Sequence, residues 1–153
     1  MAHTALQVAD KFIRLGLDDG KKFTQMQLLK LVYIAHGWML GATDQPLIDN
    51  LVEAWQYGPV IPALYHELKY NAAKPIEKPI LVTEENFSED ELEVITFTYE
   101  NYGQLSAFQL SDITHATNTP WSQTFGRDNY IPNSLISKHY KELYQKYLTD
   151  NTK

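Results

Sequence analysis

Apolar residues recur along most of this chain with the period of an α-helix. The clearest stripe follows Thr24, and its members on one helical face are Leu28, Leu31, Val32, Ala35 and Met39. Further stripes comprise Val8, Phe12 and Ile13; Leu92, Ile95, Tyr99 and Tyr102; Phe108, Leu110 and Ile113; and Ile136, Tyr140, Leu143 and Tyr147. The pattern predicts about five principal helices, each turning these side chains toward a core.

Four of these helices begin with the same local signal. A serine or threonine is followed three residues later by glutamine or glutamate in Thr4–Gln7, Thr24–Gln27, Ser88–Glu91 and Ser106–Gln109. In such a capping box, side chains satisfy two backbone amides that the first turn leaves without partners. Gly20, Gly41 and Gly103 stand where three of the helices should end.

Only two short runs have β character. Leu51–Tyr57 precedes a Gly-Pro pair, and Ile80–Thr83 follows a proline. We expect the two runs to pair as a small ribbon, which needs helices packed against it to be stable. The length of 153 residues suits one domain. The predicted fold is therefore mainly α, a single compact helical domain over residues 1–153 with about five principal helices and a short two-stranded β-ribbon.

The segment from Trp55 to Leu64 concentrates the strongest conformational signals. Gly58 can adopt a positive φ, and Pro59 fixes its own φ near about −65°, as does a second proline three residues later. These residues predict a strand that turns sharply into a helix, with Trp55 and Tyr57 at the corner. Such a corner is either a packing hub or a recognition surface whose exposed aromatic residues contact a partner.

Composition narrows the possible chemistry. The chain has no cysteine, which excludes disulfides, thiolate metal sites and a cysteine nucleophile. No two of the five histidines are three or four residues apart, so the helical zinc-ligand pattern is absent and we expect neither metal nor cofactor. The first residues lack the basic and apolar regions of a secretory signal, and no apolar stretch is long enough to span a bilayer. We expect a cytoplasmic protein with no membrane partner.

The net charge of −6 arises in the second half of the chain. Residues 81–153 hold five Lys and Arg against eleven Asp and Glu, and six of these acids fall between Glu84 and Glu93. Lys30 is the only Lys or Arg between Thr24 and Gly41, where a DNA-recognition helix would need several. Because phosphate contacts require a basic patch, the sequence argues against nucleic acid as a partner.

One pair of residues suggests an enzyme as an alternative. Asp112 and His115 are three apart on one helical turn, so the acid is positioned to orient a general base. No nucleophile elbow or phosphate-binding loop accompanies them. The competing interpretation is structural: His115 hydrogen-bonds within the fold and braces the turn before Pro120. We also expect Trp55 and Trp121 to be substantially buried.

Several blocks together resemble a known family. They are Ala5–Ile13, Thr24–Trp38, Pro46-Leu47, Glu53–Pro62 with its Trp-x-Tyr-Gly-Pro-Val sequence, Thr114-His115 and Pro120-Trp121. In this order they are similar to the Panacea domain, found in SocA-like antitoxins and phage-associated GepA-like proteins. The resemblance spans most of residues 4–121.

This resemblance implies an antitoxin without enzymatic activity, which neutralises a toxin encoded beside it by direct binding. The alternative within the family is an adaptor that delivers the toxin to a cytoplasmic protease. The expected partner-binding residues are Trp55, Tyr57, Gly58, Pro59, Val60 and Pro62 at the corner and Glu84, Glu85, Glu89 and Asp90 in the acidic stretch. His115, Pro120 and Trp121 are expected to form a structural motif.

Overall fold

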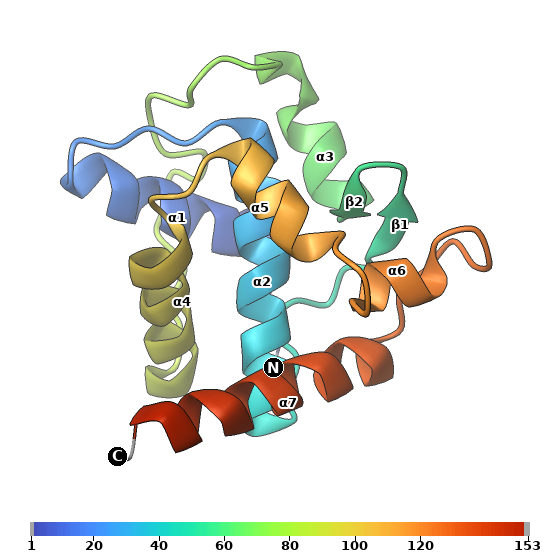
Figure 1. Ribbon diagram of the computed structural model, residues 1–153. Helices are drawn as coiled ribbons and strands as arrows, with labels where there is room; N and C mark the ends of the chain where they lie inside the picture. Colours follow the sequence, from blue (N-terminus) through green and yellow to red (C-terminus); the bar gives the residue numbers. More distant parts are fainter. Residues whose placement is uncertain (1, 152–153) are drawn as a thin grey trace.

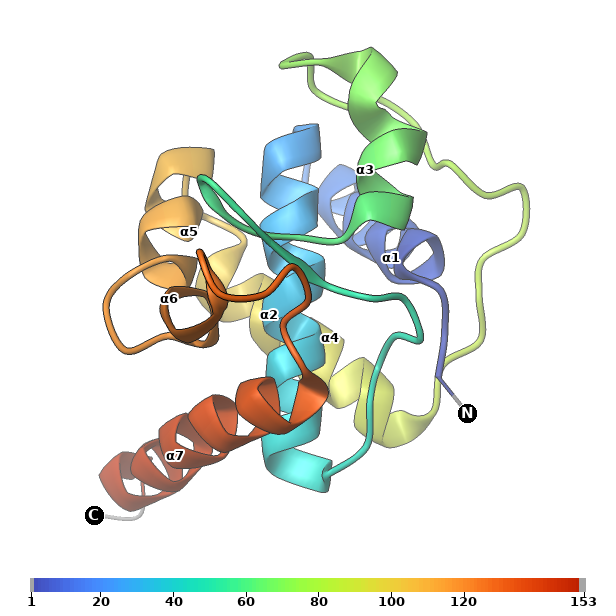
Figure 2. The same ribbon diagram turned by 90° about the vertical axis from the view of Figure 1, so that its right-hand side faces the viewer.

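One central helix organises the fold. The computed structural model describes residues 2–151, in which helix α2 runs through the middle and the other elements surround it (Figures 1 and 2). The helices are α1 (Ala5–Asp18), α2 (Gln25–Thr43), α3 (Pro62–Leu68), α4 (Glu89–Tyr102), α5 (Ala107–Thr114), α6 (Pro120–Thr124) and α7 (Asn133–Asn151), with a 3₁₀ turn at Lys69–Asn71. Strands β1 (Glu53–Trp55) and β2 (Gly58–Val60) form a two-stranded antiparallel sheet. The predicted mainly α fold is confirmed.

Helix α2 is enclosed rather than half-exposed. Every residue from Leu28 to Gly41 is buried, including the polar residues Lys30 and His36. The sequence suggested a stripe facing one side, but α1, α4, α5, α7 and the hairpin pack around the whole circumference. A helix buried on all sides leaves little solvent for its polar side chains, so they depend on partners inside the protein. Lys30 and His36 have such partners, whereas the buried Tyr33 hydroxyl has none among the described residues.

The predicted capping boxes are present at all four positions, with both the side-chain and the backbone hydrogen bonds formed. A fifth box begins α6: the Thr119 hydroxyl accepts from the Ser122 amide, and the Ser122 hydroxyl accepts from the Thr119 amide. The sequence pattern missed this box because serine replaces the usual glutamine or glutamate at its third position.

Two glycines allow α7 to cross α2 closely. A Cβ added at Gly37 would lie 2.3 Å from the ring of Tyr140, and one at Gly41 would lie 2.6 Å from the Tyr140 carbonyl carbon. The interpretation of Gly41 as a helix stop is wrong, because α2 does not end there. The helix continues to Thr43 and ends at Asp44, which adopts the left-handed conformation with φ of 61°.

The predicted pairing of the ribbon is also wrong. Strand β1 pairs with β2 immediately after it, not with residues 80–83. The backbone amides of Ile80 and Leu81 instead donate to one carboxylate oxygen of Asp10, at 2.8 and 2.9 Å, and Arg14 donates to the Leu81 carbonyl at 2.7 Å. Because side chains of α1 satisfy these backbone groups, the segment has no need of a strand partner.

Four side chains predicted to face inward are exposed: Leu92, Phe108, Ile113 and Tyr147. On α4 the buried positions are Glu91, Ile95 and Thr98. The buried face therefore includes two polar residues, which a prediction from apolar residues alone does not find. Helix α5 buries only Leu110 and Thr114 and leaves its remaining surface in solvent.

His36 fastens two segments to α2. Its Nδ1 accepts hydrogen bonds from the backbone amides of Leu47 and Ile48, at 3.2 and 3.3 Å, while Nε2–H donates to the side chain of Asn133 at 3.0 Å. This pattern requires the neutral ring. Burial lowers the pKa of His36, which keeps the ring neutral at physiological pH. His36 is thus a packed histidine of the core.

The close crossing yields a first prediction. Gly41→Ala places a methyl group against the backbone of α7, and we expect it to lower the free energy of unfolding by about 1–3 kcal/mol, as overpacking does. Alanine favours helix over glycine by about 1 kcal/mol, so an effect of packing must exceed that gain. Urea denaturation measures the difference. The control is Ala42→Gly at the neighbouring exposed position, and a more stable Gly41→Ala variant contradicts the close approach.

Candidate functional site

The predicted strand-to-helix corner folds as a tight β-hairpin that leads into α3. Trp55 stands opposite Gly58, so the chain reverses through Gln56 and Tyr57. Gly58 has a φ of 124°, which residues with a side chain rarely adopt. The corner therefore reverses direction once before the helix begins at Pro62, where a proline suits the first turn.

Lys30 holds this hairpin from the side of α2. Its Nζ donates to the Pro59 carbonyl at 2.9 Å and lies 3.5 Å from the Tyr57 carbonyl. The side chain is 1% exposed, and its ammonium contacts backbone carbonyls rather than a carboxylate. Burial lowers the pKa of Lys30 to about 8, because the charged form loses its hydration.

The contact of Lys30 with the hairpin also explains why position 58 is a glycine. A Cβ at position 58 would lie 2.8 Å from Nζ of Lys30. From the other side Ser111 of α5 donates its hydroxyl to the Tyr57 carbonyl at 2.8 Å. In Figure 2 the hairpin tip lies beside α5, as this bond requires. The turn is thus fixed by side chains of two helices, neither of which the sequence pattern connected to it.

The two tryptophans meet next to the turn of the hairpin. Trp121 donates its indole N–H to the Trp55 carbonyl at 2.5 Å and stacks on Phe125, with ring centroids 4.8 Å apart. Trp55 donates to Glu53 at 2.8 Å and meets Tyr65 edge-on. Both tryptophans are half-buried, so the expected deep burial holds only in part.

His115 serves packing rather than an Asp-His pair. Its Nδ1 hydrogen-bonds to the Ser111 carbonyl, and its ring meets Trp121 edge-on at 5.4 Å. Asp112 is exposed. The turn before the buried Pro120 is held chiefly by Thr119, whose hydroxyl donates to the Ala116 carbonyl at 2.7 Å. His115 thus hydrogen-bonds within the fold as expected, but its bond points back to Ser111 of α5 and it contacts the segment at Pro120 only through the Trp121 ring.

Three of the six expected contact residues at the corner are internal. Gly58, Pro59 and Val60 are buried, whereas Tyr57 at the tip is 68% exposed. Phe108 on the adjacent α5 is 86% exposed and lies one helical turn before Ser111, on the same side of the helix. We name Tyr57 and Phe108 the hairpin patch.

The acidic stretch divides into two groups. Glu84 pairs with Lys11 at 2.7 Å, while Glu85 and Glu91 both bind His3, at 3.0 and 2.9 Å. Burial opposes protonation of His3, but the two carboxylates outweigh it and raise the pKa of the ring. These acids join the N-terminal part of the chain to the start of α4. A second group, comprising Glu89, Asp90 and Glu93, is exposed on α4.

Metal binding and membrane insertion are two further properties that bear on function. Within residues 2–151, no three His, Asp or Glu side chains are close enough together to hold a metal ion. None of the helices in that range has the length and apolar character needed to cross a bilayer.

Comparison with known proteins places these features in a family. Residues 28–122 match the family described as Antitoxin SocA-like, Panacea domain. The chain belongs to this SocA-like Panacea family. A 108-residue segment is 33% identical to Antitoxin SocA of Caulobacter vibrioides (strain NA1000 / CB15N), covering 64% of this chain and 57% of that protein. No solved structure matches the chain.

The family match contains the whole hairpin assembly. Lys30, the hairpin, Ser111 and Trp121 all fall within residues 28–122, whereas α7 lies beyond them. The Trp-x-Tyr-Gly-Pro-Val sequence therefore has a physical basis in this fold. Its glycine leaves room for the Lys30 ammonium, and its proline carbonyl accepts a hydrogen bond from that ammonium.

Lys30 supplies a prediction with a defined pH dependence. The pKa of Lys30 is about 8 in the folded protein, whereas in the unfolded chain it is close to the ordinary lysine value of 10.5. Between these values the unfolded chain binds more protons, so stability rises with pH. We expect wild type to gain roughly 3 kcal/mol relative to Lys30→Met between about pH 8 and 10.5.

Urea denaturation of both proteins across this pH range measures the difference, and tyrosine titration affects both alike. The control Lys138→Met removes an exposed lysine and leaves the hairpin contacts intact. If wild type and Lys30→Met show parallel pH profiles, the ammonium of Lys30 is not buried as the structure has it.

Proposed function

We propose that this protein is an antitoxin that neutralises its cognate toxin by binding it directly in the cytoplasm, without chemical modification. Membership of the SocA-like antitoxin family carries the proposal. The disposition of the candidate catalytic residues favours binding over catalysis: His115 bonds to Ser111, Asp112 lies in solvent, and His36 is enclosed elsewhere in the core.

The hairpin patch is the contact surface that we propose first. Tyr57 and Phe108 are large aromatic side chains exposed on adjacent elements, and tyrosine is enriched among residues that dominate binding energy. The backbone beneath Tyr57 is held by Lys30 and Ser111. A surface fixed in this way loses little conformational entropy on binding, which favours affinity.

The acids of the stretch then have different roles. Glu84 and Glu85 are engaged with Lys11 and His3, and we propose that they act mainly through the negative field of this face. Glu89 and Asp90 are exposed and available for direct contact. Such a field steers a basic partner and raises the association rate, an effect that weakens as salt is added.

The test is co-expression with the product of the adjacent gene. We expect a stoichiometric complex that abolishes toxicity. The double variant Tyr57→Ser/Phe108→Ser should weaken the complex about 30-fold or more, because loss of an aromatic hot spot costs about 2 kcal/mol. Isothermal titration calorimetry gives the affinity. Tyr70→Ser is the matched control, since it removes a tyrosine that is 86% exposed on another element.

Other outcomes have definite meanings. Rescue of growth by sub-stoichiometric antitoxin, with no complex detected, contradicts neutralisation by binding and indicates delivery to a protease or catalysis. An unchanged affinity in the Tyr57→Ser/Phe108→Ser variant removes the hairpin patch from the interface while leaving the antitoxin function intact.

A further inference from the structure

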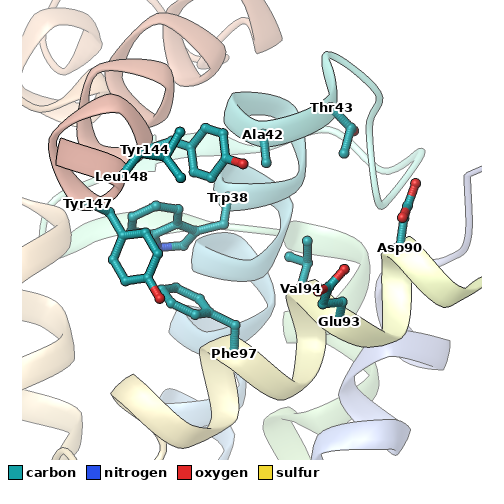
Figure 3. A pocket seen from close by; sticks show the side chains of 10 residues that line it. All are labelled: Trp38, Ala42, Thr43, Asp90, Glu93, Val94, Phe97, Tyr144, Tyr147 and Leu148. Carbon is teal, nitrogen blue, oxygen red and sulfur yellow. The ribbon is translucent and has the colours of Figure 1, made fainter. Parts of the chain in front are cut away.

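A groove lies between α2, α4 and α7, separate from the hairpin patch. Its volume is about 440 Å³, and Figure 3 shows the side chains that line it. Aromatic residues gather at one end and two carboxylates stand along α4. The residues that matter here are Trp38, Phe97, Tyr144, Tyr147, Asp90 and Glu93. We name this feature the α2–α4–α7 groove.

The aromatic end is built from tilted rings. The centroid of Trp38 lies 5.0 Å from that of Phe97 and 6.4 Å from that of Tyr147, and Phe97 lies 5.3 Å from Tyr147. The Trp38 indole N–H donates to the Tyr102 hydroxyl at 3.2 Å. Trp38 itself is only 7% exposed and forms the floor of this end, so the half-buried Phe97 and the exposed Tyr147 supply most of the aromatic surface that an apolar side chain or the stem of a long cation can contact.

The acidic side of the groove carries carboxylates that form no ion pair among the described residues. Asp90 and Glu93 are both exposed, and neither has an ion-pair partner among the described residues. Asp90 lies in the first turn of α4, where the helix dipole favours an acid, but Glu93 lies beyond that turn. Lys141 of α7 is already paired with Asp44, at 2.5 Å. The groove therefore keeps an unbalanced negative charge beside an apolar surface.

We propose that the α2–α4–α7 groove receives a basic amphipathic segment of the partner toxin. An apolar side chain of that segment packs on Trp38, Phe97 and Tyr147, and a Lys or Arg reaches Asp90 and Glu93. This assignment rests on the proposed antitoxin function and names a second surface for the same partner. Walls formed by helices and a charged margin are the arrangement used when an amphipathic helix lies in a groove.

Charge complementarity selects this occupant over others. A second copy of this chain carries a net charge of −6, so it would bring repulsion to the acidic margin. A neutral apolar ligand would leave the two carboxylates without a role. One wall of the groove, α7, lies outside residues 28–122, so the groove is not a feature that the family match accounts for.

The first test uses a probe of known chemistry. A short helical peptide of leucine, phenylalanine and arginine is titrated into the full chain and followed by the NMR signal of the Trp38 indole N–H. We expect that signal to shift, and the double variant Asp90→Asn/Glu93→Gln to weaken binding about 10-fold or more. The same peptide with glutamate in place of arginine should not bind. Glu100→Gln/Glu142→Gln, which removes two other exposed acids from α4 and α7, is the matched control.

Both altered carboxylates are exposed, so the variant is expected to keep the fold, and its melting curve checks this. The proposal is overturned if the Asp90→Asn/Glu93→Gln variant binds the peptide as tightly as wild type. It is also overturned if the peptide shifts the NMR signals of residues outside the groove. The same variant is then titrated with the toxin. A toxin affinity equal to wild type overturns the groove assignment and leaves the antitoxin function standing. Failure of wild type to bind the toxin overturns the proposed function, whereas the peptide alone decides whether the groove prefers a basic segment.

Discussion

The burial of α2 on every side is the constraint on which the rest of the structure depends. Burial of an unpaired polar or charged group costs several kcal/mol or more, so a polar side chain on an enclosed helix favours a fold that supplies it with partners. Lys30 and His36 are such groups, and each meets backbone from a distant part of the chain. The two polar residues in the helix thereby specify where the hairpin and the segment at Leu47 attach.

Close approach is the second constraint on α2. Gly37 and Gly41 lie one turn apart and remove the Cβ atoms that would collide with Tyr140. This brings α7 near enough to α2 for Trp38 to meet the aromatic side chains of α4 and α7. The α2–α4–α7 groove is thus a consequence of two glycines that contribute no contact of their own to it.

Local signals predicted most of the helices, whereas contacts between distant residues escaped prediction. Capping boxes depend on residues three apart, so Thr4, Thr24, Ser88 and Ser106 marked helix starts directly from the sequence. The ribbon was assigned the wrong partner because the bonds that decide it come from Asp10, some seventy residues away along the chain. For Lys30 a signal did exist: a single lysine within an otherwise apolar run, Leu28 to Ala35, is a charge that must find acceptors in the core.

The candidate site shows the same division. The sequence indicated that the Trp-x-Tyr-Gly-Pro-Val segment is important, but it did not indicate which of its residues are exposed. The turn exposes Tyr57, whereas Gly58, Pro59 and Val60 of the following strand are all buried, and this assignment required knowing where the chain reverses. The acidic stretch looked uniform in sequence, yet His3 and Lys11 divide it into engaged and free carboxylates. Neither His3 nor Lys11 is adjacent to the acids in sequence.

One rigid element links the two proposed surfaces. Lys30 and Trp38 are eight residues apart on α2, or about 12 Å along the helix axis. The helix carries the hairpin patch, through Lys30, at one position and the floor of the groove at another. A partner that contacts both surfaces makes the second contact intramolecularly, so two modest interactions combine into a high affinity when their spacing matches. Because a buried helix does not change its length, the fold fixes the spacing between the hairpin patch and the groove. That spacing favours a partner whose basic segment and whose surface for the hairpin patch are held at the same separation.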